Sequence, residues 1–172
     1  MSNKILLTGR PGCGKTTLIK RIASKLGRAA GGFYTEEIRR GRTRVGFKLV
    51  TLDGDEAVLA HVDFKTSERV SKYGLDLSAL EKVAIEAVRK AMRARHVLVI
   101  DEIGPMEIRS AKFRAAVNEA LDSGAPVLGT IFARPLPFTD AIKSRHDVML
   151  VDVRSENRDE VVAEILAKFQ AR

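Results

Sequence analysis

A glycine-rich segment near the start of the chain has the composition and spacing of a phosphate-binding loop. Residues 9–16 read GRPGCGKT, which fits G-x-x-x-x-G-K-T, with a strand-like run before it and a helical run after it. The glycines let the backbone curl so that successive N–H groups point at phosphate oxygens, and the helix N-terminus adds partial positive charge. We expect Lys15 to reach the β- and γ-phosphates, Thr16 to bind Mg²⁺ and Thr17 to donate to the α-phosphate.

A second segment places two acids at the end of an apolar run. The stretch 97–100 is continuously apolar, as in a strand buried on both faces, and Asp101 and Glu102 follow it directly. Such an aspartate holds Mg²⁺ through its water shell, and such a glutamate orients and deprotonates a water in line with the γ-phosphate. The predicted catalytic residues are therefore Lys15 and Glu102, and the predicted metal ligands are Thr16 and Asp101. The predicted nucleotide-binding residues are Gly9, Arg10, Pro11, Gly12, Cys13, Gly14, Lys15, Thr16, Thr17, Ile100, Asp101, Glu102, Ile103 and Gly104.

The same two segments argue against a regulatory GTPase. A glutamate directly after the aspartate is a common way for P-loop ATPases to prepare a water molecule. Regulatory GTPases read guanine with Asn-Lys-x-Asp, and the nearest stretch here, residues 157–159, lacks the lysine and the spacing. The pattern therefore favours an ATPase-like hydrolase.

Strand-like and helix-like apolar patterns alternate along most of the chain. Such alternation predicts a parallel sheet covered by helices. The pair Asp53-Gly54 is a strong hairpin signal, and it predicts an antiparallel insertion that runs to Leu75, with its hairpin at about residues 41–65. We expect residues 1–172 to form a single α/β domain, with a mainly parallel sheet flanked by helices.

The apolar patterns also place the individual elements. Strands are expected at residues 5–7, 32–38, 45–51, 56–60, 97–100, 127–132 and 148–153. Helices are expected at residues 16–26, 77–91 and 110–121, around Ala141, and near the end of the chain.

Three acidic residues outside the two motifs are weaker candidates for the site. Glu36 and Glu37 are expected at the end of the second strand, where they would approach the γ-phosphate or an acceptor, or else form a solvated entry to the hairpin. Glu107 is expected to cap the helix that follows, with binding of an acceptor as the alternative.

Four residues near the ends of later strands are further weak candidates. Arg134 or Arg145 would stabilise the transition state as an internal arginine finger, a role worth roughly 10³–10⁵-fold in rate, or else form surface ion pairs. Asn157 and Arg158 follow the last predicted strand and would border the base or ribose. Asn157 is also a candidate helix N-cap.

Composition and charge limit the ligands and the classes of protein that fit this sequence. The 172 residues carry 30 basic and 22 acidic side chains, a net charge of +8 that favours anionic ligands. Part of this charge lies in a basic hairpin, which we define as Arg39, Arg40, Arg42, Arg44 and Lys48, and which fits a phosphate lid, a nucleic-acid surface or a protected sheet edge.

The single cysteine excludes an intramolecular disulfide. No apolar run reaches the roughly 18 residues of a membrane span, and the chain opens directly into a strand-like run. We therefore expect a cytoplasmic protein, as a monomer, with no membrane partner.

Five segments together resemble a known family. In order along the chain they are residues 9–17, 32–37, 44–47, 101–107 and 157–159. They resemble the small stand-alone nucleoside-triphosphatase family first described from thermophiles, which includes the cancer-related nucleoside-triphosphatase. The resemblance covers nearly the whole chain. It implies slow Mg²⁺-dependent hydrolysis of nucleoside triphosphates to diphosphate and phosphate, with broad tolerance of the base. It also implies the three-layer P-loop fold, in either a RecA-like or a kinase-like strand order.

The expected function is thus a nucleoside-triphosphate phosphohydrolase with Mg²⁺ as cofactor. A small-molecule or nucleotide kinase is the first alternative, and its acceptor would sit near Glu36, Glu37 and the basic hairpin. A nucleic-acid-linked ATPase is the second alternative, suggested by the net charge of +8.

Overall fold

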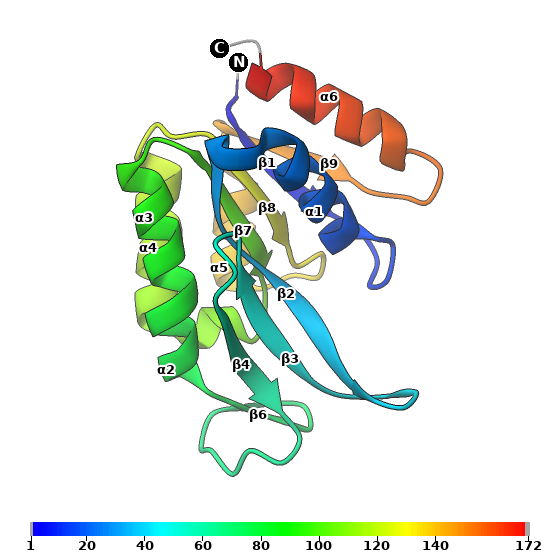
Figure 1. Ribbon diagram of the computed structural model, residues 1–172, viewed down its shortest axis with the longest axis vertical. Coiled ribbons are helices and arrows are strands. Elements are labelled where there is room, and N and C mark those ends of the chain that lie inside the picture. The colour runs from blue at the N-terminus through cyan, green and yellow to red at the C-terminus, as the bar shows by residue number, and fades with distance from the viewer. Residues whose placement is uncertain (1, 171–172) are drawn as a thin grey trace.

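In the computed structural model, which describes residues 2–170, five strands form the parallel half of one nine-stranded sheet (Figure 1). The sheet order is β5-β6-β4-β3-β2-β7-β8-β1-β9, and β8 lies between the phosphate-loop strand β1 and the acid-bearing strand β7. This separation is the RecA-like order and not the kinase-like one. The parallel strands are β1 (Lys4–Thr8), β2 (Ala30–Arg40), β7 (Val97–Ile103), β8 (Val127–Ile131) and β9 (Val148–Asp152).

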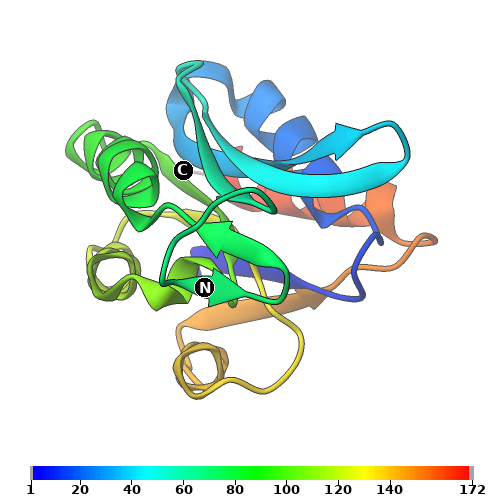
Figure 2. The same ribbon diagram turned by 90° about the horizontal axis from the view of Figure 1, so that it is seen from below.

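The central strands form because their side chains are apolar on both faces. Ile5, Leu6 and Leu7 of β1 are completely buried, and so are most residues of β7 and β8. Helices cover the two faces, so the parallel half has three layers (Figure 2). The helices α1 (Lys15–Leu26) and α6 (Arg158–Gln170) pack on one face. The other face is covered by α2 (Leu77–Ala79), η2 (Leu80–Ile85), α3 (Glu86–Arg93), α4 (Ala111–Asp122) and α5 (Pro137–Lys143).

The β2 strand joins the parallel and antiparallel halves. It pairs with β7 only from Ala30 to Phe33, and from Phe33 to Arg40 it pairs with β3 (Thr43–Thr51). Figure 1 shows this long hairpin extending beyond the parallel strands. The antiparallel half continues through β4 (Glu56–His61), β5 (Arg69–Val70) and β6 (Tyr73–Leu75), as the sequence predicted. Two short 3₁₀ turns, η1 (Gly27–Ala29) and η3 (Glu107–Arg109), complete the fold.

Two element boundaries differ from the prediction. The second strand does not stop near residue 38, because pairing with β3 carries it to Arg40, so Glu36 and Glu37 lie within the strand. The helix predicted at residues 77–91 is one continuous helical segment to Arg93, but Leu80–Ile85 adopts wider π-helical turns. Periodicity alone does not distinguish such a turn from a regular α-helix.

Gly32 of β2 pairs directly with Val99 of β7, and its replacement tests this packing. Its φ is +122°, and a Cβ there would collide with the carbonyl of Val99. We expect Gly32→Ala to lower the free energy of unfolding by about 2–4 kcal/mol, because both the backbone conformation and the space oppose a side chain.

The matched control is Gly54→Ala in the β3–β4 turn. Gly54 also has a positive φ, +100°, but a Cβ there would meet nothing within 4 Å. We expect it to cost about 1 kcal/mol, the conformational part alone. Urea unfolding of both variants measures the difference, and equal losses would mean that the approach to Val99 is not what requires glycine.

Candidate active site

The phosphate loop joins β1 to α1 and requires glycine at two of its positions. Gly14 precedes the first helical residue with a left-handed φ of +99°. Gly9 has a φ of +143°, and a Cβ there would lie 2.7 Å from the carbonyl oxygen of Val153. The glycine spacing therefore sets the curl of the loop, as predicted.

Lys15 lies folded across this loop. Its ammonium donates to the carbonyl oxygens of Gly9, at 2.9 Å, and Arg10, at 3.2 Å. Cys13 Sγ lies 3.9 Å from the same nitrogen. Thr16 and Thr17 follow in the first turn of α1, and Thr17 is exposed. The ammonium is thus held at the loop by neutral carbonyls, which a phosphate would outcompete as a charged acceptor.

Asp101 is buried near the end of β7 and has a free oxygen. It is 1% exposed, and Oδ1 accepts from Thr130 Oγ1 at 2.5 Å. Burial raises the pKa of Asp101, while the hydrogen bond from the Thr130 hydroxyl opposes that rise. Within residues 2–170, Oδ2 is the only buried side-chain oxygen or nitrogen that lacks a hydrogen-bond partner.

This orphaned oxygen fits the predicted divalent cation. A buried carboxylate oxygen without a donor is costly unless a cation or water completes it. No group of three or more His, Cys, Asp or Glu side chains in the described part of the chain could hold a metal by itself. Mg²⁺ is usually held by one or two protein oxygens together with waters and phosphates, which matches Asp101 and Thr16 as the protein's contribution.

Glu102 follows Asp101 in a largely buried position. Burial is the main cause that raises the pKa of Glu102 to about 7, the charge of Asp101 raises it further, and Lys15 opposes the rise. Gly104 faces this carboxyl group, and a Cβ at Gly104 would collide with Glu102 Oε1. Asp101 and Glu102 therefore lie at the same end of the parallel strands as Lys15.

The structure buries the side chains of two predicted nucleotide-binding residues, Ile100 and Ile103. Ile100 is 1% exposed and Ile103 is completely buried, and both belong to the core beneath α3 and α4. Their side chains therefore support β7, and the prediction that they bind the nucleotide now concerns their main chain.

The prediction that Glu107 caps the following helix is wrong. Ser110 caps α4, because its hydroxyl accepts from the N–H of Phe113 at 3.1 Å. Glu107 is instead 5% exposed and lines, with Glu102, a cavity of about 150 Å³. Burial raises the pKa of Glu107 well above its usual range, and the charge of Glu102 adds to that.

The stability of a Glu107→Gln variant should depend on pH in a defined direction. A buried carboxyl with a raised pKa keeps its proton in the folded state after the unfolded chain has lost it, so wild-type stability falls as pH rises above about 4.5. Glutamine has no such penalty. We expect the melting temperature of the variant, relative to wild type, to increase between pH 4.5 and pH 8. A constant difference across that range would show that Glu107 does not carry this penalty.

Arg158 and Asn157 lie beside the phosphate loop in the β9–α6 connection. Arg158 Nε donates to the Cys13 carbonyl at 2.8 Å, and its guanidinium lies against Gly14. Asn157 closes its own loop, since it accepts from Arg154 N–H and donates to the Asp152 carbonyl, both at 2.9 Å. A cavity of about 560 Å³ separates this connection from the phosphate loop.

Glu36 and Glu37 are both engaged in ion pairs. Glu36 accepts from Lys20 at 2.6 Å, and Glu37 accepts from Arg44 at 2.8 Å. These partners lower the pKa of each carboxyl. The basic hairpin is largely neutralised as well, since Arg39 also pairs with Glu37, Arg40 with Asp63, and Lys48 with Glu36 and Glu56.

The two arginines suggested as arginine fingers lie at opposite ends of the parallel strands. Arg134 follows β8 and is exposed at the edge that holds the phosphate loop. Arg145 precedes β9, where it pairs with Asp122 and Asp147 at 2.9 Å, next to the start of β1. The structure therefore rules out Arg145 as a finger in this conformation, because it is one strand length from the loop.

Similarity to known proteins identifies the family of this chain. A family model described as NTPase matches residues 4–166. The chain belongs to this NTPase family. It is 46% identical over 164 residues to the nucleoside-triphosphatase THEP1 of Thermotoga maritima, which covers 95% of this chain and 94% of the relative. It is 38% identical to the cancer-related nucleoside-triphosphatase homolog of Bos taurus, covering 99% of this chain and 98% of the relative.

A solved structure of the NTPase family has the same fold. The crystal structure of THEP1 from Aquifex aeolicus superposes with a TM-score of 0.89 at 37% identity, covering 96% of this chain and 98% of that chain. The family and the P-loop fold inferred from the sequence motifs are thus confirmed. Among residues 2–170, no helix has the length and apolar character needed to cross a bilayer.

Proposed function

We propose that this protein is a Mg²⁺-dependent nucleoside-triphosphate phosphohydrolase that converts NTP and water to NDP and phosphate. The observation that carries the proposal is the unpaired, buried Oδ2 of Asp101 at the edge of the sheet that also holds Glu102 and Lys15. Membership of the NTPase family supports the same reaction. The proposal treats residues 1–172 as one catalytic unit that works as a cytoplasmic monomer.

Each residue has a separate part in this proposal. Lys15 and the N–H groups of the phosphate loop stabilise charge on the β- and γ-phosphates. Thr16 and Asp101 hold Mg²⁺, which when bound neutralises negative charge on the phosphate oxygens. Glu102 orients the water molecule and accepts its proton, and a pKa near 7 suits a base at neutral pH.

The cavity beside Glu102 favours water over a larger acceptor. Its volume of about 150 Å³ is bounded by Phe47, Val70, Pro105 and Met106. A cavity needs only about 10–15 Å³ of such volume to hold a water molecule, so the space admits water. It is smaller than the usual range of about 300–1,000 Å³ for small-molecule sites, and so it is small for a sugar or nucleotide acceptor. This supports hydrolysis over the kinase alternative.

The loop next to the 560 Å³ cavity supports broad base tolerance. Both polar ends of the Asn157 side chain make hydrogen bonds within the loop, which fix the orientation of this side chain. Arg158 is the neighbouring flat side chain, and a guanidinium stacks on any base through its π face. ATP, GTP and other triphosphates are therefore expected substrates.

A phosphate-release screen tests the proposal directly. Purified protein is assayed with each common NTP, alone, with candidate hydroxyl acceptors and with RNA or DNA. Hydrolysis predicts phosphate release without any acceptor and little response to nucleic acid, since most of the basic hairpin is ion-paired. Turnover that requires an acceptor would establish a kinase, and salt-sensitive stimulation by RNA or DNA would establish a nucleic-acid-linked ATPase.

Metal dependence of nucleotide binding gives a second test. We expect ATP with Mg²⁺ to raise the melting temperature more than ATP with EDTA, because Asp101 and Thr16 gain a ligand only when the metal is present. Asp101→Asn should reduce the difference between the two conditions. Equal shifts in the wild-type protein would contradict the metal role of Asp101.

A further inference from the structure

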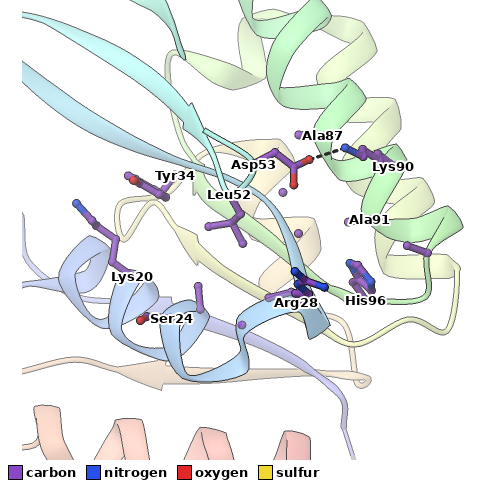
Figure 3. Close-up of a pocket in the computed structure, with 16 residues that line it drawn as sticks. Lys20, Ser24, Arg28, Tyr34, Leu52, Asp53, Ala87, Lys90, Ala91 and His96 are labelled. Atoms are coloured by element: carbon purple, nitrogen blue, oxygen red, sulfur yellow. Dashed lines mark hydrogen bonds and ion pairs between the residues drawn. The ribbon is translucent and has the colours of Figure 1, made fainter. Parts of the chain in front are cut away.

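A large cavity lies away from the phosphate loop, along an uncovered edge of β2. The β3 strand leaves β2 at the Phe33–Thr51 pair, and Leu52 makes the last hydrogen bond, to the Gly32 carbonyl at 3.0 Å. The edge from Ala30 to Gly32 therefore has no neighbouring strand on that side. Between α1, α3 and the turn after β3, this leaves a space of about 830 Å³ (Figure 3). We call it the edge cavity.

The edge cavity has an apolar wall. Tyr34 and Leu52 line it from β2 and from the turn, and the small side chains of Ala23, Ala87 and Ala91 line it from the two helices. Lys20 lies 4.8 Å above the Tyr34 ring and holds that ring at the wall. Its volume lies within the usual range of about 300–1,000 Å³ for small-molecule sites.

The rim of the edge cavity is predominantly basic. Two of its cations are already matched, because Lys20 pairs with Glu36 at 2.6 Å and Lys90 with Asp53 at 2.7 Å. Two further polar side chains of the lining are the Arg28 guanidinium and the His96 imidazole. Among the described residues, neither of these side chains forms a hydrogen bond or ion pair, and Figure 3 shows both in the cavity lining. Asp53 is the one acid that lines the cavity.

We propose that the edge cavity binds a small organic anion in which a planar aromatic group carries a single phosphate or carboxylate. The anionic group would pair with the Arg28 guanidinium and accept a hydrogen bond from the His96 imidazole. The ring would pack on Tyr34, Leu52 and the alanines. Charge complementarity and the apolar wall thus select different parts of one ligand. This site is separate from the phosphate loop, and the inference does not depend on the proposed hydrolysis.

A titration followed by NMR tests this site residue by residue. ¹⁵N-labelled protein is first saturated with Mg²⁺ and ADP, and phenyl phosphate or benzoate is then added. We expect the amide signals of Gly31, Gly32 and His96 to shift with saturation, while those of Gly12 and Gly14 in the phosphate loop do not. Shifts confined to the loop, or spread evenly over the surface, would overturn the proposal.

Two fragments separate the two parts of the ligand. Inorganic phosphate carries the charge without the ring, and phenol carries the ring without the charge. We expect each to bind at least tenfold more weakly than phenyl phosphate. Equal binding by inorganic phosphate would show a non-specific anion site, and equal binding by phenol would show an apolar patch, and either result rejects the proposal. Benzoate against phenyl phosphate then shows which anionic group the site prefers.

A charge-reversal pair assigns the anion contact. Arg28→Glu is expected to weaken phenyl phosphate binding at least tenfold. Arg42→Glu, at an exposed arginine in the β2–β3 turn, changes the net charge equally and should alter binding less than twofold. Both side chains are exposed, so neither change should unfold the protein. Equal losses in the two variants would mean that overall charge, and not Arg28, attracts the anion.

Discussion

Replacing Lys15 by alanine is expected to reduce triphosphate turnover by about 10³-fold while leaving the protein folded. The ammonium lies at the loop, 2.9 Å from the Gly9 carbonyl, and no other cation donates to that loop from inside α1. It supplies charge where the β- and γ-phosphates would lie, and removing one such preorganised donor typically costs about 10²–10³-fold in rate. The measurement is steady-state phosphate release at saturating ATP and Mg²⁺.

A lysine on the same helix gives the matched control. Lys25 lies exposed in the last turn of α1, so Lys25→Ala removes the same charge without touching the loop. We expect it to retain wild-type turnover, and both variants to melt within a few degrees of wild type. Near-normal turnover in Lys15→Ala would show that the loop is not the catalytic phosphate site.

Glu102→Gln is expected to slow the chemical step by about 10²–10⁴-fold with little change in affinity for ATP and Mg²⁺. Glutamine keeps the shape of the side chain against Gly104 but cannot accept a proton, and that range is usual for the loss of one general base. Single-turnover phosphate release at excess protein isolates this step from product release. An unchanged rate would exclude Glu102 as the base and move that role to Glu36, Glu37 or Glu107.

Two other substitutions serve as comparisons for Glu102→Gln. Asp101→Asn should weaken Mg²⁺-dependent binding as well as the rate, because the orphaned Oδ2 is the proposed metal contact. Glu37→Gln should leave the single-turnover rate within about twofold of wild type, since Glu37 is paired with Arg39 and Arg44. If Glu37→Gln and Glu102→Gln were equally slow, a general loss of acidic charge would explain both.

The residues that the sequence placed correctly are those whose geometry is local. The curl around Gly9 and Gly14 depends on φ values that glycine permits, and Lys15 follows in the first helical turn. The spacing of residues within this eight-residue segment was therefore enough to predict the shape of the phosphate loop. Asp101 and Glu102 were found for a related reason, since they end an apolar strand whose parallel neighbours all end at one edge.

The contacts that the sequence could not indicate depend on distant partners. Arg145 belongs to a network with Asp122 and Asp147 at the opposite edge, and nothing near it in sequence indicates this. Glu107 lines a cavity together with Phe47 and Val70 of the antiparallel half. Arg158 reaches Cys13 across 145 residues of sequence. Each contact follows from strand order, which the sequence had left open between two arrangements.

The position of β1 in the sheet sets when the protein can first bind its ligand during synthesis. β1 is the first strand made, yet its partners are β8, where Lys4 aligns with Val127, and β9, where Ile5 aligns with Met149. A nascent chain on the ribosome therefore carries the complete GRPGCGKT sequence long before anything holds the loop in shape. Contacts of such sequence separation form late. Nucleotide binding should thus appear only after residues up to about 152 have left the exit tunnel, so that triphosphate is captured by finished chains and not by growing ones.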